Sequence, residues 1–344
     1  MSADSSTGLV RSLAHRLAGE GFDLPDDGAL ASFAGATAWL NSEPPTPEGL
    51  RGKVVLVDFW TYTCVNWLRT LPYVRAWASK YREQGLVVVG AHTPEFLFEH
   101  DLDNVRESLR WFKVDWPVAQ DNDYGVWGAF DNHYWPAVYL ADAHGRIRYH
   151  HFGEGEYAAT EMAIQRLLMD AGATDIDQNL VMVEPRGLEV PADWRFVQSP
   201  ETYVGYGQAS GFANEANAAY DRPQLYTPLS LSLNEWTLSG NWTVARHAGV
   251  VNEPGAAISF RFHARDLNLV MAPQAKGTSL PFRVTLDGQP LGDDHGDDAD
   301  AQGNGTLSDQ RTYQLIRQRG PIRERTATIE FLEAEAEAYC FTFG

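Results

Sequence analysis

One cysteine in the sequence stands where a thiol can act as a nucleophile. Cys64 follows a continuous apolar run at residues 54–60 and precedes a segment, residues 68–81, whose apolar side chains recur at helical spacing. A thiol at the start of a helix lies beside free backbone N–H groups and the positive end of the helix dipole, which stabilise the thiolate. We therefore expect the pKa of Cys64 to lie below that of a free cysteine, with the thiolate attacking disulfides or peroxides.

A carboxylate and two prolines accompany this cysteine. Asp58 lies six residues before Cys64, Pro72 lies eight residues after it, and Pro136 precedes a later predicted strand. This pattern resembles thioredoxin, and the segments WTYTC, GAHTPEF, DNDYGVW, YWPA and HFGEGEY are similar to TlpA-like thioredoxins of the DipZ type. The resemblance covers roughly residues 35–344. It implies that Asp58 is a buried proton-handling carboxylate and that Pro136 is the cis-proline beside the active cysteine. The alternative for Asp58 is a purely structural, hydrogen-bonded carboxylate.

The sequence departs from this family at the second redox cysteine. The C-x-x-C motif of the family reads Cys64-Val65-Asn66-Trp67, so no neighbouring thiol resolves a mixed disulfide formed at Cys64. Three interpretations remain. In the first, Cys64 is a monothiol catalyst acting on a mixed disulfide or a peroxide, and an external thiol completes turnover. In the second, the fold serves non-catalytic binding. In the third, Cys340 resolves Cys64. We favour the first.

Further residues are expected to surround the thiol. Thr61 gives a T-x-x-C motif that resembles peroxiredoxins, in which the hydroxyl supports the thiolate, and it is assigned to the catalytic group. Four other side chains are expected to form a binding surface: Asn66, Trp67, His133 and Trp135. Trp67 lies three residues after Cys64, on the same helix face, and is expected to cover the sulfur. The alternative is that its ring packs into the core.

Two clusters and one loop combine histidines or acidic residues. The clusters are His92 with Glu95, and His150 and His151 with Glu154. Adjacent histidines in a strand point to opposite faces, so structural contacts are favoured over a metal site. The acidic loop at residues 292–305 partly resembles a calcium loop but lacks the glutamate at its twelfth position, which favours a solvated loop. The sequence thus indicates neither a metal nor a cofactor.

Alternating strands and helices are predicted to position the cysteine. We expect strands at 54–60 and 86–93, a hairpin at 137–153, and helices at 68–81, 104–112, 124–130 and 160–172. This alternation predicts an α/β thioredoxin fold over residues 35–180, with a mixed sheet and helices on both faces. Residues 1–34 are interpreted as an N-terminal helical extension, because Leu9, Val10, Leu13 and Leu17 form an apolar stripe.

The pattern changes after a linker rich in proline and glycine, residues 181–194. Beyond it, short strand-like segments separated by turn signals predict an all-β jelly roll or sandwich over residues 195–344. The resemblance implies that this domain is carbohydrate-binding-module-like, and in the non-catalytic binding interpretation it recruits a protein or glycan partner. Cys340 alternates with aromatic residues in the last segment and is expected in the core. Core positions are also favoured for Trp236 and Trp242 over a sugar-stacking surface.

The charge of the chain limits its partners. The formal net charge is −19 at pH 7. An acidic surface repels nucleic-acid phosphates and anionic lipids, which disfavours both as partners. No apolar run approaches the length of a membrane span, no secretion signal is recognised, and two cysteines do not make a disulfide framework. We therefore expect a cytoplasmic protein whose substrates are a small thiol and a disulfide or peroxide.

Overall fold

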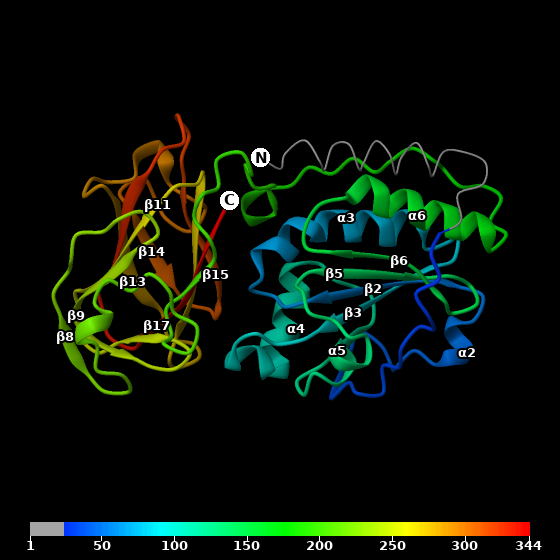
Figure 1. The fold of residues 1–344 in the computed structure, drawn as a ribbon, viewed down its shortest axis with the longest axis horizontal. Helices are drawn as coiled ribbons and strands as arrows, with labels where there is room; N and C mark the ends of the chain where they lie inside the picture. The colour runs from blue at the N-terminus through cyan, green and yellow to red at the C-terminus, as the bar shows by residue number, and fades with distance from the viewer. Residues whose placement is uncertain (1–23) are drawn as a thin grey trace. The chain divides into compact units, whose positions relative to one another are not determined.

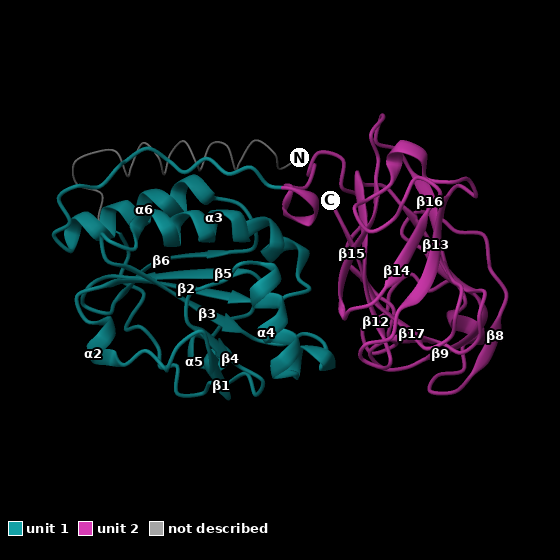
Figure 2. Ribbon diagram, turned by 180° about the vertical axis from the view of Figure 1, so that it is seen from behind, with its two compact units in different colours: residues 1–185 teal, residues 186–344 magenta. Residues whose placement is uncertain are grey.

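The computed structural model describes residues 24–344, so the predicted stripe of Leu9, Val10, Leu13 and Leu17 lies outside the described residues. The chain divides into two compact units between Pro185 and Arg186 (Figure 2). This division falls inside the predicted linker at residues 181–194. Among residues 24–344, no helix has both the length and the apolar character needed to cross a bilayer.

The first unit is built on a six-stranded sheet in the order β1-β4-β3-β2-β5-β6 (Figure 1). Its strands are β1 (Ala38–Leu40), β2 (Val54–Trp60), β3 (Leu86–His92), β4 (Val118–Gln120), β5 (Ala137–Ala141) and β6 (Ile147–Phe152). Its α-helices are α2 (Pro47–Leu50), α3 (Val65–Tyr81), α4 (Leu102–Trp111), α5 (Gly125–Ala129) and α6 (Tyr157–Asp170). Strands β2, β3 and β4 run parallel, and β1, β5 and β6 are antiparallel to their neighbours. The predicted thioredoxin fold is confirmed.

The two faces of β2 have different environments because successive side chains alternate across a strand. Val55, Val57 and Phe59 pack with Val126 of α5 in one apolar cluster. Asp58 and Trp60 point to the opposite face, where α3 lies. Helices α3 and α6 lie side by side on that face in both Figures 1 and 2, and the Glu161 carboxylate of α6 accepts hydrogen bonds from three α3 residues, Trp77, Lys80 and Tyr81. The ionisable carboxyl group of Asp58 on β2 is therefore buried beneath α3.

Residues 24–34, which the sequence analysis assigned to the helical extension, contain no helix in the structure. They run beside the β5–β6 hairpin, where Ala29 bridges Arg146 and the N–H of Asp27 donates to Ile147 O. Leu30 and Phe33 then pack against the apolar cluster of the sheet. This lead-in is therefore part of the first unit.

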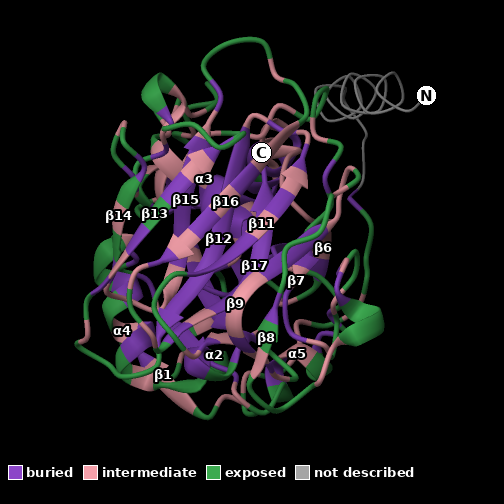
Figure 3. Cartoon of the chain, turned by 90° about the vertical axis from the view of Figure 1, so that its left-hand side faces the viewer, coloured by how far each residue is buried: buried purple, intermediate pink, exposed green. Residues whose placement is uncertain are grey.

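The second unit, residues 186–344, is a curled sheet in which every pairing between named strands is antiparallel. Its strands are β7 (Thr202–Tyr203), β8 (Gln224–Tyr226), β9 (Trp236–Val244), β10 (Gly249–Val251), β11 (Ala256–Phe262), β12 (Asp266–Pro273), β13 (Leu280–Leu286), β14 (Asn304–Leu307), β15 (Arg311–Arg317), β16 (Arg325–Phe331) and β17 (Ala336–Phe343). Figure 3 shows β11, β12 and β17 mostly in the colour of buried residues. Trp236 and Trp242 are fully buried, so neither indole offers a surface for stacking on a sugar.

Residues of the predicted linker form hydrogen bonds with one unit or the other. The N–H of Val181 donates to Glu161 in the first unit. In the second unit, Arg317 donates to the carbonyl of Gly187 at 3.0 Å, and Arg265 donates to the carbonyl of Pro191 at 2.8 Å. Residues 186–194, which the sequence analysis placed in the linker, are therefore hydrogen-bonded to the β-domain through Gly187 and Pro191.

Candidate functional site

Cys64 is the N-cap residue of α3, the position at which the sequence predicted it. Strand β2 ends at Trp60, and the N–H of Cys64 donates to Thr61 O at 3.2 Å, which closes the turn between strand and helix. Cys64 and Asn66 are partly exposed, whereas Val65 and Trp67 are buried. Cys64 therefore lies at the N-terminal start of a 17-residue helix and is partly exposed to solvent.

Asp58 lies beneath the first turn of α3 and is fully buried. Trp67 Nε1 donates to its Oδ2 at 3.0 Å, and Oδ1 has no hydrogen-bond partner within the described part of the chain. Burial raises the pKa of Asp58 to about 7, and the Trp67 hydrogen bond opposes that rise. A carboxyl group with this pKa is able to hold or release a proton near neutral pH.

Trp67 does not cover the sulfur of Cys64 as a surface shield. Its side chain is fully buried and stacks on Trp60 with ring centroids 4.2 Å apart. The ring also meets the edge of Phe112 at 5.7 Å. Complete burial of a large apolar ring is strongly stabilising, and the indole N–H donates to Asp58 in the core. The buried position of Trp67 is therefore favoured over a position that covers the sulfur. The shielding expectation is therefore wrong.

Glu99, which sequence analysis did not single out, organises the turn that leads to Cys64. It is fully buried, and its Oε1 accepts hydrogen bonds from the Thr63 hydroxyl at 2.6 Å and the Thr63 N–H at 3.3 Å. Its Oε2 accepts from the N–H groups of Glu95 and Phe96. Burial raises the pKa of Glu99, while these donors and Thr61 lower it. A glutamate inside the apolar segment EFLFEH, residues 95–100, was the available sequence signal.

Thr61 is fully buried, and its hydroxyl lowers the pKa of Glu99. The Thr61 hydroxyl has no hydrogen-bond partner among the described residues, so the thiolate support implied by the T-x-x-C motif stays a prediction. Thr61 contributes to the position of Cys64 through its backbone carbonyl.

The proline opposite the active turn has the expected conformation. The Trp135–Pro136 peptide bond is cis. Ala137 pairs with Phe59, so Pro136 precedes the strand residue that lies beside the end of β2. Trp135 packs on Trp127 with centroids 4.3 Å apart. His133 is largely exposed, and its Nε2 lies 3.4 Å from Asp131 Oδ1.

Asn66 is held by a buried ion pair on the first turns of α3. Arg69 donates to Glu154 Oε2 at 3.2 Å and to Asn66 Oδ1 at 3.4 Å. The Arg69 and Glu154 side chains are only 2% and 8% exposed. The neighbouring Gly153 N–H donates to Pro136 O at 2.8 Å. The HFGEGEY segment thus links the helix of the cysteine to the strand of the cis-proline.

His92 lies on the α3 side of the sheet, since it pairs with Trp60 across parallel strands. Its ring meets Trp60 edge-on at 4.7 Å and stacks near Tyr62 at 5.7 Å. Neither ring nitrogen meets a partner on another residue among 24–344. Burial lowers the pKa of His92 to about 3, so the imidazole is neutral at physiological pH.

Across residues 24–344, no three His, Cys, Asp or Glu side chains are arranged to hold a metal ion. In the acidic loop at 292–305, Asp298 pairs with Arg311, and Asp300 accepts hydrogen bonds from Asn304. The carboxylates of Asp298 and Asp300 are thus engaged in contacts within the domain.

Cys340 lies in β17 and is 2% exposed. It pairs with Tyr203 of β7 and Val270 of β12, and its thiol donates to Phe341 O at 3.5 Å. A thiol fixed in a central strand cannot attack a disulfide at another site without local unfolding. This burial argues against the interpretation in which Cys340 resolves Cys64.

Both units are similar in sequence to known proteins. A family model described as "Thioredoxin like C-terminal domain" matches residues 199–344. Protein DipZ of Mycobacterium bovis is 36% identical over 272 residues, which cover 76% of this chain and 37% of DipZ. The thiol-disulfide oxidoreductase YkuV of Bacillus subtilis is 28% identical over 141 residues, covering 41% of this chain and 95% of YkuV. The chain thus matches little more than a third of the length of DipZ.

A solved thioredoxin-like protein in its oxidised form is 30% identical, with a TM-score of 0.39. The match covers 42% of this chain and 96% of that protein.

Proposed function

Because the chain is a thioredoxin-fold protein of the DipZ/TlpA-like type, we propose that it is a monothiol redox protein whose reactive group is Cys64. One observation carries the proposal: Cys64 is accessible at the N-cap of α3, while the position of the second redox thiol holds the buried Trp67. Similarity to relatives named thiol-disulfide oxidoreductases supports a disulfide as substrate.

The first step is exchange at Cys64. The thiolate attacks one sulfur of a disulfide, a new bond forms between Cys64 Sγ and that sulfur, and the other half leaves as a thiolate that takes up a proton. The N–H groups of the first helical turn stabilise the negative sulfur before attack. The buried Glu99 fixes the turn that precedes the thiol through its hydrogen bonds with Thr63.

The second step requires a thiol from outside the chain. Trp67 provides no sulfur to displace the bound half, and Cys340 is buried. A small thiol therefore attacks the mixed disulfide at the substrate sulfur, releases a new disulfide and returns Cys64 as the thiolate. A second equivalent of small thiol reduces that released disulfide, so the net result is one disulfide reduced and two thiols oxidised.

The test is turnover of a small mixed disulfide, such as a glutathionylated peptide, coupled to regeneration of reduced glutathione. We expect a rate proportional to glutathione concentration, a Cys64 adduct detected by intact mass when glutathione is omitted, and loss of both in Cys64→Ser. Activity that persists in Cys64→Ser contradicts the proposal. A Cys64 adduct that glutathione does not release favours the non-catalytic binding alternative.

A further inference from the structure

A pocket of about 880 Å³ lies in the first unit, at the opposite end of β2 from the cysteine. Its wall includes Val55 at the start of β2 and Gly145 in the β5–β6 turn, whereas Cys64 follows the end of β2. A seven-residue strand spans about 20 Å, so the pocket is separate from the redox site. Its volume lies in the range of sites that enclose small organic ligands, about 300–1,000 Å³.

The wall of this pocket is mainly apolar. Leu30, Phe33, Trp39 and Leu50 line it while packing on the apolar cluster of the sheet, and each remains partly exposed. Val55, which is 1% exposed, contributes from the sheet. Because removing apolar surface from water lowers the free energy, the wall favours an aliphatic chain over a polar molecule.

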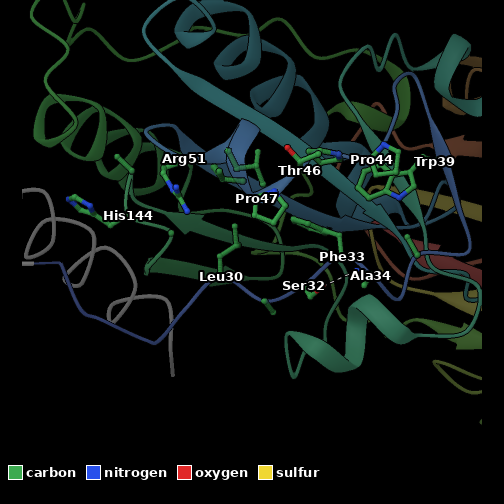
Figure 4. A pocket seen from close by; sticks show the side chains of 17 residues that line it. Leu30, Ser32, Phe33, Ala34, Trp39, Pro44, Thr46, Pro47, Arg51 and His144 are labelled. Carbon is green, nitrogen blue, oxygen red and sulfur yellow. Dashed lines mark hydrogen bonds between the residues drawn. The ribbon is translucent and has the colours of Figure 1, made fainter.

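The basic side chains of the wall lie at one end. Figure 4 shows Arg51 and His144 towards one end of the pocket and Trp39 and Pro44 towards the other. Arg51 forms no ion pair with a carboxylate in the described part of the chain, although the sequence has 46 acidic residues. Asp142, in the adjoining hairpin, is already engaged with Arg148 and the His144 N–H. The cationic end is therefore available to an anionic group.

We propose that this pocket binds single-chain carboxylates, with the alkyl chain against Phe33 and Trp39 and the carboxylate beside Arg51. A guanidinium at the mouth pairs with a carboxylate in partial contact with water, and the apolar wall buries methylene groups. The two ends of the pocket match the two ends of a medium-chain fatty acid. No step of the redox reaction at Cys64 enters this inference, which stands on the pocket alone.

The test uses 11-(dansylamino)undecanoate as a fluorescent probe of the full chain, with unlabelled fatty acids as competitors below their micelle concentrations. We expect saturable binding at one site per chain. Octanoate should compete roughly fifteenfold less well than decanoate, since the two differ by two methylenes and each buried methylene changes affinity by about fourfold. The uncharged amide of the probe should bind more weakly than the carboxylate, by up to about fivefold.

Two variants locate the site. Arg51→Glu changes an exposed position and should weaken carboxylate binding by at least about fivefold while leaving the amide unchanged. Ala36→Phe places a ring in the pocket wall and should abolish binding of both probes. Arg110→Glu, an equally exposed charge reversal on α4, is the matched control and should bind like the unaltered chain. Absence of saturable binding, or equal binding by Arg51→Glu and Arg110→Glu, overturns the proposal.

Discussion

Trp67 Nε1 donates a 3.0 Å hydrogen bond to Asp58 Oδ2, which joins the residue at the second redox position to the buried carboxyl group beneath it. In the C-x-x-C pattern this position carries a thiol, whose proton a nearby carboxylate can accept. Here the same carboxyl group accepts a hydrogen bond from an indole that cannot give up its proton near neutral pH. The pair therefore acts as a structural connection between β2 and α3.

Replacement of Trp67 by cysteine should convert the site to dithiol chemistry. Trp67→Cys places a thiol beside a carboxyl group whose pKa is about 7, and so supplies both the resolving sulfur and a proton acceptor. We expect the variant to reduce insulin disulfides after stoichiometric prereduction, without added small thiol, and the unaltered chain to lack this activity. Loss of the buried indole should lower the free energy of unfolding by about 3 kcal/mol or more.

The matched control is Trp67→Ser, which removes the same ring and adds no sulfur. Its stability should fall by a similar amount, and its insulin reduction should stay at the level of the unaltered chain. Insulin reduction by the serine variant equal to that of the cysteine variant would show that access, and not a second thiol, limits the unaltered site.

Asp58 should make stability depend on pH. Its folded pKa is about 7 and its unfolded pKa is about 3.9, so the folded state binds the extra proton between these values. The stabilisation that protonated Asp58 contributes is fully present below the unfolded pKa. It is lost as pH rises through the folded pKa, and the total loss is roughly 4 kcal/mol. Asp58→Asn retains an acceptor for Trp67 and should remove this slope. Urea unfolding at pH 5 and pH 8 measures the difference.

Because His92 also titrates, the pH dependence of stability must be compared between the unaltered chain and Asp58→Asn. Its folded pKa of about 3 lies below its unfolded value, so it adds stability as pH rises towards 6.5. The two slopes oppose each other over much of the acidic range, whereas the difference between the unaltered chain and Asp58→Asn isolates Asp58. A difference that stays constant from pH 5 to pH 8 would contradict the raised pKa.

Glu99 should control the order of the turn before Cys64. Glu99→Gln replaces an acceptor with an amide N–H₂ group, which cannot satisfy all the donors now held by the carboxylate. Each buried N–H left unpaired costs about 1–3 kcal/mol. We expect faster hydrogen exchange at the Thr63 amide and slower alkylation of Cys64 than in the unaltered chain. Glu107→Gln, on the surface of α4, should change neither rate.

The two thiols should differ strongly in reactivity. Cys64 is accessible at the start of α3, whereas Cys340 is buried in β17. Alkylation at neutral pH followed by intact mass should show one fast modification, absent from Cys64→Ser, and a second that appears only in denaturant. A rate for Cys64 equal to that of free cysteine would remove the thiolate stabilisation on which the redox proposal depends.

Long periodic elements and the position of the cysteine were predictable from sequence, because each is set by local pattern. The apolar run at 54–60 is β2 over its full length, and the stripe at 68–81 lies within α3. Strands β1 and β4 escaped prediction because each is three residues long and is fixed by pairing with the other. The contacts of Trp67 and Glu99 could not be predicted either, since their partners lie 9 and 36 residues away in the sequence.

The β-domain should fold alone, provided that the fragment begins at Arg186. Arg317 and Arg265 donate to the carbonyls of Gly187 and Pro191, so these residues belong to the domain although they precede its strands. A fragment covering 186–344 should unfold cooperatively, and one covering 195–344 should be less stable by about 1–3 kcal/mol, because two arginine hydrogen bonds are lost. Urea unfolding of both fragments, followed by fluorescence of the buried Trp236 and Trp242, measures this difference. Equal stability of the two would show that residues 186–194 contribute nothing, and a fragment 186–344 that stays unfolded would show that the domain depends on the first unit.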